Sequence, residues 1–372
     1  MPSNHIAKSP NARVSRRFAA LACAIVACLP NLAQANPQIV VDVNSGQVIA
    51  HEDAFRKWYP ASLTKLMTAY TTFKAIRAGE LSLESVVVMS EKAAAQPASK
   101  MYYKPGSKLT LDSALKILIV KSANDVAVAI GERVGGTLDN FVARMNADAQ
   151  SLGMTSSRFV NPNGLPGKGQ YTTARDLAVL AVALRRDFPE YAGYFSLEGI
   201  NTGKKEYPNY NLLIGRFDGA DGMKTGYICA SGFNQVSSAT RNGRTVVSVV
   251  LGADSLGARA DLSADLLQKA LTTPRGAGPR LESLAPYGAG RDTVTDISAE
   301  VCNPQARKVR SEGRDEAGRM KLLSPYIHEM GRPPRTVFAG LIPGSEPPAK
   351  KPGSAGASEI ANVPIPKPRP TF

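Results

Sequence analysis

Ser62 and Lys65 stand three positions apart at the start of a segment with helical periodicity. Because residues three apart share a helix face, the Lys65 amine can lie beside the Ser62 hydroxyl. Burial near a second cation lowers the pKa of a lysine, so that its neutral form can accept the serine proton. The positive potential of a helix N-terminus also favours a developing anion there. Taken alone, the pair fits an ordinary helix start equally well.

Ser122 and Asn124 form a second candidate element, sixty positions after Ser62. They fall in a connection between two predicted helices, where loop side chains can point into a cleft. A serine hydroxyl there can pass a proton to a leaving amine. The Asn124 amide offers a donor and an acceptor that could hold a peptide group.

Lys224, Thr225 and Gly226 form a third candidate element, shortly before a predicted strand. At a strand edge this triplet presents an ammonium and a hydroxyl side by side, and the glycine lets a ligand approach the backbone. An exposed strand edge also binds extended peptides through main-chain hydrogen bonds. The triplet therefore suits a peptide that ends in a carboxylate.

Histidine chemistry is nearly absent from the candidates, since the chain has three histidines: His5, His51 and His328. A Ser-His-Asp hydrolase would have to use His51, and no G-x-S-x-G turn accompanies it. We expect His51 to be a structural or surface residue. Neither H-E-x-x-H nor a close Cys/His cluster exists for zinc, so the sequence predicts no metal and no cofactor. Lysine is then the base if the protein uses a nucleophile.

Other polar residues have simpler interpretations. Thr172 or Thr173 is expected to cap a helix. Asp125 is expected to be a helix N-terminal acid. Arg216 is expected to be a surface charge, although it could help to bind a carboxylate.

The motifs Ser62-x-x-Lys65, Ser122-x-Asn124 and Lys224-Thr225-Gly226 together resemble those of the serine penicillin-binding proteins and class A β-lactamases. Two further stretches, Asn161–Leu165 and Asp221–Gly226, together with Tyr59–Lys65, are most similar to the low-molecular-mass D-alanyl-D-alanine carboxypeptidases. The resemblance covers roughly Pro37 to Ala270. It implies an α+β fold of the β-lactamase/transpeptidase type, in which helices and a helical subdomain flank an antiparallel five-stranded sheet.

The resemblance also implies the roles of the residues. Ser62 would attack the carbonyl between two D-alanines, Lys65 would accept its proton, and Ser122 would pass a proton to the departing D-alanine. Backbone N–H groups of Ser62 and Tyr227 would hold the oxyanion. The implied substrate-binding residues are Asn124, Lys224, Thr225, Gly226 and Tyr227.

The predicted function is therefore a serine D,D-carboxypeptidase that trims peptidoglycan stem peptides and is covalently inhibited by penicillins. A D,D-endopeptidase that cleaves crosslinks would use the same machinery and remains an alternative. A β-lactamase is less favoured, because Glu198–Asn201 does not match the Glu-x-x-Leu-Asn pattern of class A enzymes. A non-catalytic wall-binding protein would not need three intact motifs. No nucleic-acid partner is expected.

The elements that must position these residues follow from periodicity. Apolar runs around Asn44–Gly46 and around Arg241–Arg244 predict two β-hairpins. Helical periodicity and start signals predict six helices: Ser62–Ile76, Leu111–Val120, Asp125–Val134, Leu138–Leu152, Thr173–Arg185 and Ala258–Leu271. Strands at both ends of a helical middle favour an α+β architecture with a mainly antiparallel sheet.

The ends of the chain predict an exported protein. Three arginines precede the apolar run Phe18–Leu29 and the small-residue site Ala33-Gln34-Ala35, which is typical of a signal peptide cleaved before Asn36. The apolar run is too short to span a membrane, which takes about 20 residues. The expected place is the periplasm or the wall outside the membrane. The Pro-rich end lacks an amphipathic anchor helix, so no firm membrane attachment is predicted.

The predicted organisation is a signal peptide over 1–35, a catalytic domain over 36–272, a weakly structured extension over 273–340 and a Pro-rich disordered tail over 341–372. A formal charge of +14 suits an anionic polymer or simply solubility. Export permits a disulfide between Cys229 and Cys302. Their wide separation in sequence favours two free thiols, with Cys229 used in packing.

Overall fold

The computed structural model describes residues 36–276, 278–306, 308 and 320–347. A five-stranded sheet with the order β2-β1-β9-β8-β7 forms one part, and all neighbouring strands run antiparallel. Its strands are β1 (Gln38–Asp42), β2 (Val48–Glu52), β7 (Ala220–Ile228), β8 (Gly232–Arg241) and β9 (Arg244–Ala253). The predicted α+β class, the five-stranded antiparallel sheet and both hairpins are confirmed.

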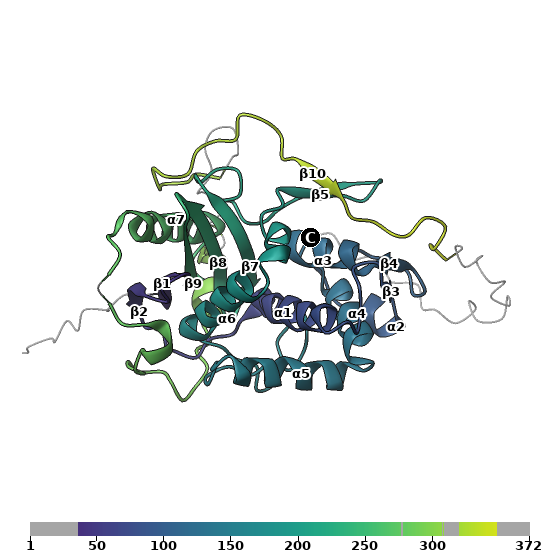
Figure 1. Ribbon diagram of the computed structural model, residues 1–372, viewed down its shortest axis with the longest axis horizontal. Coiled ribbons are helices and arrows are strands. Elements are labelled where there is room, and N and C mark those ends of the chain that lie inside the picture. Colours follow the sequence, from purple (N-terminus) through teal and green to yellow (C-terminus); the bar gives the residue numbers. More distant parts are fainter. Residues whose placement is uncertain (1–35, 277, 307, 309–319, 348–372) are drawn as a thin grey trace, which may run out of the picture. The chain divides into compact units, whose positions relative to one another are not determined.

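Helices cover both faces of this sheet, which explains why its strands are continuous apolar runs rather than alternating ones. On β1, Val40 packs in the cluster on the side of α7 (Leu256–Thr272). Its neighbours Ile39 and Val41 point to the opposite face and join the main core with α1 (Thr64–Arg77) and α6 (Ala174–Asp187). Figure 1 shows α7 on one side of the strands and α6 with α1 on the other.

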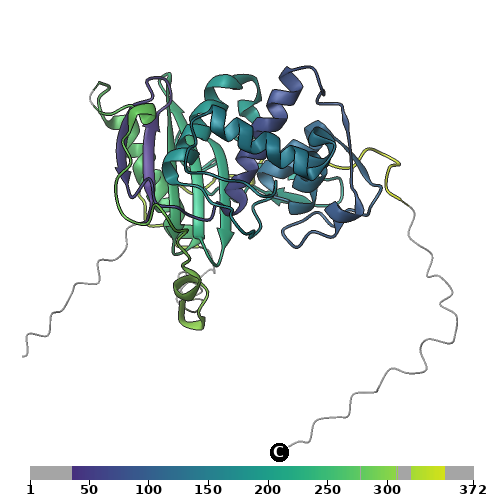
Figure 2. The ribbon, with the colours of Figure 1, turned by 90° about the horizontal axis from the view of Figure 1, so that it is seen from below.

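The helical region packs around α1, which is buried along nearly its whole length. Its other main helices are α3 (Leu111–Val120), α4 (Asn124–Gly135) and α5 (Leu138–Ser151). In Figures 1 and 2 these helices lie beside the sheet, with β7 the sheet strand closest to them. The edge strand β7 therefore faces the helical region, where a ligand can lie between them.

Side-chain caps set where several helices begin. The hydroxyls of Thr110, Thr137, Thr173 and Ser255 each accept the backbone N–H three residues later, at the starts of α3, α5, α6 and α7. Each cap satisfies one of the free N–H groups of a first turn. Thr173 is thus the cap that the sequence predicted, with Asp176 in the first turn.

One predicted helix begins later than expected. Ser62 lies in a short 3₁₀ turn, η1 (Ala61–Leu63), and α1 starts at Thr64. Pro60 precedes the turn as its N-cap, in keeping with its role as a start signal. The prediction Leu111–Val120 coincides with α3, and the other predicted helices differ from the observed ones by at most two residues at either end, which is within the usual uncertainty of helix boundaries.

Short elements were not predicted, because they span too few residues to show a period. They are β3 (Val86–Val88), α2 (Glu91–Ala94), β4 (Lys108–Thr110), η2 (Pro189–Tyr194), β5 (Gly199–Asn201) and β6 (Glu206–Pro208). The β3–β4 pair and the β5–β6 hairpin each form a small sheet beside the helices.

The described residues from 279 to 306 and from 320 to 347 form a C-terminal extension that packs back onto the sheet and the helical region. It contains η3 (Leu281–Ser283), α8 (Ser298–Val301) and β10 (Thr336–Phe338). β10 adds a parallel strand to β5, and the segment then reaches β4, where the Ile342 N–H donates to the Lys108 carbonyl at 2.9 Å. Figure 1 shows the yellow part of this extension running over β5 toward β4.

The expectation of two free thiols is wrong. Cys229 and Cys302 form a disulfide, with Cα atoms 5.5 Å apart across 73 positions of sequence. The extension folds back so that the end of α8 lies against the turn that follows β7, and this return brings the two cysteines together. Sequence distance carried no information about that contact.

Among the described residues, no helix is long and apolar enough to cross a membrane. The predicted signal peptide and the residues beyond 347 lie outside the part that the structure describes.

Candidate active site

Ser62 lies where the helical region meets the edge of the sheet. The preceding Ala61 has a φ of +47°, an uncommon conformation for a residue with a side chain. Two glycines fit tightly around this turn. A Cβ on Gly226 would lie 3.0 Å from the Ser62 nitrogen, and a Cβ on Gly164 would lie 1.8 Å from the Ala61 oxygen. The turn therefore depends on close backbone approach from two distant segments.

Lys65 is fully buried directly behind Ser62. Its Nζ lies 3.0 Å from Ser62 Oγ, 2.8 Å from Asn124 Oδ1 and 2.6 Å from the Asn163 carbonyl oxygen. A neutral amine can donate two hydrogens to the two carbonyl-type oxygens of Asn124 and Asn163 and accept the Ser62 proton with its lone pair. This arrangement is that of a base prepared to activate a hydroxyl.

The electrostatic surroundings favour the neutral form of Lys65. Burial, and then the nearby charge of Lys224, hold the Lys65 pKa well below its ordinary value, while the charge of Asp125 acts in the opposite direction. Desolvation and like charge both disfavour an ammonium ion. The lysine can therefore act as a general base nearer to neutral pH than a free lysine.

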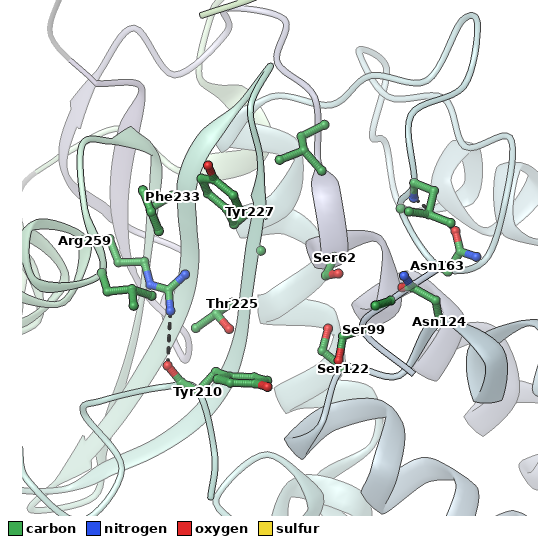
Figure 3. A pocket seen from close by; sticks show the side chains of 16 residues that line it. Ser62, Ser99, Ser122, Asn124, Asn163, Tyr210, Thr225, Tyr227, Phe233 and Arg259 are labelled. Carbon is green, nitrogen blue, oxygen red and sulfur yellow. Dashed lines mark hydrogen bonds between the residues drawn. The ribbon is translucent and has the colours of Figure 1, made fainter. Parts of the chain in front are cut away.

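Ser122 lies in the turn between α3 and α4, Asn124 is the first residue of α4, and both line the same pocket as Ser62. Ser122 has a φ of +58°, so the turn aims its short side chain into the pocket (Figure 3). The Asn124 Nδ2 donates to the Pro97 carbonyl at 3.0 Å. Because its Oδ1 already accepts from Lys65, Asn124 has only its second N–H to offer a ligand. It holds the lysine as well as facing the pocket.

Asp125 does more than start a helix. Its carboxylate accepts the backbone N–H groups of Met101 at 2.8 Å and of Tyr102 at 3.2 Å. Burial raises the pKa of Asp125, and these N–H groups oppose that effect. The residue fixes the loop 97–103, whose Ala98 and Ser99 line the pocket.

The predicted triplet Lys224-Thr225-Gly226 lies on β7, and its members differ in whether they line the pocket. Thr225 and Gly226 line the pocket, and so does Tyr227. Lys224 is only 2% exposed and is not among the lining residues, and its Nζ donates to the Thr225 carbonyl at 3.0 Å. Burial, followed by the charge of Arg259, lowers the Lys224 pKa to about 7.

Arg259 is a site residue that the sequence did not indicate. It lies on α7, is 2% exposed, and lines the pocket beside Thr225. One Nη donates to the Tyr210 carbonyl at 3.2 Å, and its buried Nε has no hydrogen-bond partner among the described residues. Burial lowers the Arg259 pKa to about 9. A buried guanidinium with an unsatisfied donor is suited to receive a carboxylate.

No spacing or motif marks Arg259 in the sequence, because it reaches the site from a helix on the far side of β8. Asn163, by contrast, could have been found from the quoted Asn161–Leu165 stretch. The other candidate arginine, Arg216, does not line this pocket.

The pocket has a volume of about 430 Å³ and lies between β7 and the helical region. Figure 3 shows Thr225 and Tyr227 on one side of it and Ser62, Ser122 and Asn124 on the other. Its lining residues are Ser62, Ala98, Ser99, Ser122, Asn124, Asn163, Gly164, Leu165, Tyr210, Thr225, Gly226, Tyr227, Ile228, Phe233, Leu256 and Arg259.

No histidine, cysteine or acidic residue is among the described residues that line this pocket. His51 is exposed on β2, at the opposite edge of the sheet from β7, and its Nδ1 lies 2.6 Å from the Tyr287 hydroxyl. The interpretation of His51 as a structural or surface residue is confirmed. The described residues contain no cluster of His, Cys, Asp or Glu that could hold a metal ion.

Comparison with known proteins gives a consistent result. Residues 26–255 match the sequence model of the family described as D-alanyl-D-alanine carboxypeptidase. The carboxypeptidase DacC of Escherichia coli K12 is 36% identical over 236 residues, which are 62% of this chain and 59% of DacC. The chain thus matches less than two thirds of the length of that relative.

Solved structures agree in fold. The D-alanyl-D-alanine carboxypeptidase DacD of Francisella tularensis is 33% identical, with a TM-score of 0.62 over 64% of this chain and 70% of that one. Penicillin-binding protein D2 of Listeria monocytogenes, in an ampicillin-bound form, is 29% identical, with a TM-score of 0.57 over 64% of this chain and 98% of that one. The likeness to these proteins, together with the family match over more than half of the sequence, shows that the chain belongs to the D-alanyl-D-alanine carboxypeptidase family of low-molecular-mass penicillin-binding proteins.

Proposed function

We propose that the protein is a serine D,D-carboxypeptidase, which removes the terminal D-alanine from peptidoglycan stem peptides through an acyl-enzyme on Ser62. The observation that carries this proposal is the buried Lys65 amine, which has a lowered pKa and lies 3.0 Å from the hydroxyl of Ser62, a residue that lines the pocket. The names of the relatives point to the same activity.

Acylation begins with attack of Ser62 Oγ on the carbonyl carbon between the two D-alanines, while its proton passes to the neutral Lys65 amine. The negative charge that develops on the carbonyl oxygen is held by the backbone N–H groups of Ser62 and Tyr227. The close fit of Gly226 against the Ser62 nitrogen keeps these two segments together. Preorganised donors of this kind are worth about a hundredfold or more in rate each.

The leaving group departs as the C–N bond breaks and its nitrogen takes a proton, which Ser122 relays from Lys65. Thr225, with the charges of Lys224 and Arg259 beside it, holds the terminal carboxylate of that D-alanine. Water then attacks the Ser62 ester, loses a proton to Lys65, and releases the shortened peptide with Ser62 restored. Penicillins, which carry a carboxylate next to a reactive amide, would acylate Ser62 by the same route.

The structure gives no reason to expect rapid hydrolysis of a penicillin adduct. Glu198 lies away from the pocket, where the Arg332 guanidinium and the Arg335 N–H bind its carboxylate. These contacts lower the Glu198 pKa to about 2, so it is poorly suited to act as a base. We therefore propose that the protein is inhibited by β-lactams and acts on the wall outside the cytoplasmic membrane.

The first test is labelling with a fluorescent penicillin. The intact protein should be labelled, and mass spectrometry should place the adduct on Ser62. Ser62→Ala should lose the label, whereas Ser99→Ala, which changes another serine of the same pocket, should keep it. Labelling that survives Ser62→Ala would overturn Ser62 as the nucleophile.

The products of the reaction show which peptide bond the protein cleaves. Digestion of muropeptides should release free D-alanine and leave tetrapeptides. Conversion of crosslinked dimers to monomers without D-alanine release would instead show an endopeptidase.

A further inference from the structure

The C-terminal extension contacts both segments that supply the oxyanion donors of the proposed reaction. One donor, the Ser62 N–H, follows the stretch Lys57–Pro60, and the other, the Tyr227 N–H, lies just before the turn Cys229–Ser231. Residues 295–302, here called the brace, touch both stretches. The brace lies beyond residues 26–255 that match the carboxypeptidase family.

On the side of the nucleophile, the brace pairs with the backbone that leads to Ser62. The Thr295 N–H donates to the Lys57 carbonyl at 3.0 Å, and Thr295 forms a parallel bridge with Trp58. Trp58 is buried, and its Nε1 donates to the Ser231 carbonyl at 2.9 Å. The brace therefore holds the lead-in to Ser62 at a point that is itself bonded to the β7–β8 turn.

On the side of β7, the brace binds the turn covalently and by hydrogen bonding. Cys302 forms the disulfide with Cys229, two residues after Tyr227. The Ile297 N–H donates to the Ala230 carbonyl at 3.2 Å, and the Ile297 side chain closes on Gly232, where a Cβ would lie 3.0 Å from its Cδ1.

The same contacts reach side chains of the pocket wall. Val301 packs in one apolar cluster with Phe233, and the Tyr227 hydroxyl lies 3.2 Å from Cys302 Sγ. The rings of Tyr227 and Phe233 are 4.3 Å apart and both line the pocket. The wall beside Ser62 is thus supported from behind by residues of the extension.

We propose that the brace is a positioning element for the oxyanion site, and that the Cys229–Cys302 disulfide is needed for its full effect. This inference rests on the proposed acyl-transfer function. β7 is an edge strand and pairs with β8 alone. The turn that follows Ile228 is therefore held by the sheet on one side only. Oxyanion donors act only when held at hydrogen-bond distance from the developing charge, so a looser turn lowers the rate of acylation.

The test compares the oxidised protein with Cys229→Ser/Cys302→Ser. At a temperature where circular dichroism shows both folded, we expect the limiting rate of acylation by a penicillin to fall roughly tenfold in the variant, less than loss of a whole oxyanion donor would cost. The pH at which the rate rises should stay unchanged, because no residue of the brace is a hydrogen-bond partner of Lys65. If the disulfide only stabilises the fold, its removal should lower the melting temperature and leave this rate unchanged, and that result would overturn the proposal.

Chemical reduction of the Cys229–Cys302 disulfide gives an independent test of the proposal. A dithiol reagent transfers two electrons to the disulfide, which becomes two thiols, while the reagent becomes a cyclic disulfide. The reduced protein should acylate at the rate of the double variant, and reoxidation should restore the original rate. A reduced protein that acylates as fast as the oxidised one would also overturn the proposal.

Arg332→Gln is the matched control, because it breaks the contact of the same extension with Glu198 at 2.6 and 2.7 Å, away from the pocket. Its acylation rate should equal that of the unmodified protein. An equal loss in this control and in the double variant would assign the effect to the extension as a whole and contradict the brace. If the oxidised protein itself does not react with penicillin, the proposed function fails and the brace is refuted with it.

Discussion

At the scale of single residues, the site is a cluster of buried cations with different tasks. In the proposed reaction, Lys65 is neutral so that it can accept a proton, whereas Lys224 and Arg259 are charged so that they attract a carboxylate. All three are buried, and the charge of Lys224 lowers the Lys65 pKa as that of Arg259 lowers the Lys224 pKa. Mutual repulsion in a desolvated pocket thus supplies the base that histidine supplies elsewhere.

These shifts predict the pH profile of the reaction. kcat/KM should rise with pH as Lys65 loses its proton. It should fall above about pH 7, where Lys224 becomes neutral in the protein without bound substrate. A bound carboxylate favours the ammonium and raises the Lys224 pKa. The falling limb of kcat, which reports the complex, should therefore lie at higher pH than that of kcat/KM. D-alanine release measured over a pH series checks this, and coincident falling limbs would exclude Lys224 from carboxylate binding.

Arg259→Gln should lower kcat/KM for peptides that end in D-alanine. A hydrogen bond to a charged group contributes about 1.5–3 kcal/mol, so the expected loss is roughly 10- to 100-fold. Steady-state kinetics should show most of it when the peptide carboxylate is free and little when it is amidated. Arg216→Gln provides the comparison, since Arg216 does not line the pocket and its removal should leave kcat/KM unchanged.

At the scale of elements, the turn η1, which carries Ser62, is held by the loop that contains Asn163 and Gly164. Gly164 has a φ of +84° and no room for a side chain against the Ala61 carbonyl. The same loop provides the Asn163 carbonyl that binds Lys65. One short segment therefore sets both the serine turn and the orientation of the base.

Gly164→Ala should for this reason slow acylation at least tenfold, as expected where reacting groups are misplaced by about 1 Å. Gly153→Ala is a matched control, because Gly153 has a φ of +75° but nothing within 4 Å of its Cβ position. Both changes place a Cβ on a residue with left-handed backbone angles. Each should therefore lower the free energy of unfolding by about 1–2 kcal/mol, as measured by denaturant unfolding. Only Gly164→Ala should change the penicillin acylation rate, and equal rates in the two variants would contradict the role of the loop.

At the scale of the whole molecule, a buried ion pair fastens the sheet to the end of α7. Arg244 Nε donates to Asp42 Oδ2 at 2.8 Å, and an Arg244 Nη donates to the Thr273 carbonyl at 2.6 Å. Burial opposes ionisation of Asp42, but hydrogen bonds from Ser45 and Arg244 hold its pKa below the ordinary value. The extension begins at residue 279, six residues after Thr273.

Asp42→Ala should reduce the free energy of unfolding by about 3–5 kcal/mol, because it leaves the Arg244 charge buried without its partner. Glu80→Gln, which breaks the exposed pair with Arg144, should cost about 1 kcal/mol or less. Denaturant unfolding measures both. Since the Asp42 pKa is lowered in the folded state, its stabilising contribution should be lost as pH falls toward and below that pKa. A small, pH-independent effect of Asp42→Ala would contradict this account.

The sequence by itself determined the chemistry of the site and the main elements that carry it. Residue types and short spacings made Ser62, Lys65, Ser122 and Thr225 candidates, and the resemblance of the joint motifs to the penicillin-binding proteins implied their roles. The structure brings Ser62, Ser122 and Thr225 to one pocket, with the Lys65 amine behind Ser62. Periodicity over ten or more residues located the long helices and both hairpins, because a long amphipathic or buried segment leaves a repeating pattern.

Tertiary structure alone decided the rest. Arg259 and the Cys229–Cys302 disulfide join segments far apart along the chain, and no local pattern records which distant segments pack together. The deep burial of Lys65 and Lys224, which sets their pKa values, likewise comes from neighbours on other elements. Local spacing can name a nucleophile and its base, whereas desolvation, close backbone approach and crosslinking exist only after the chain has folded.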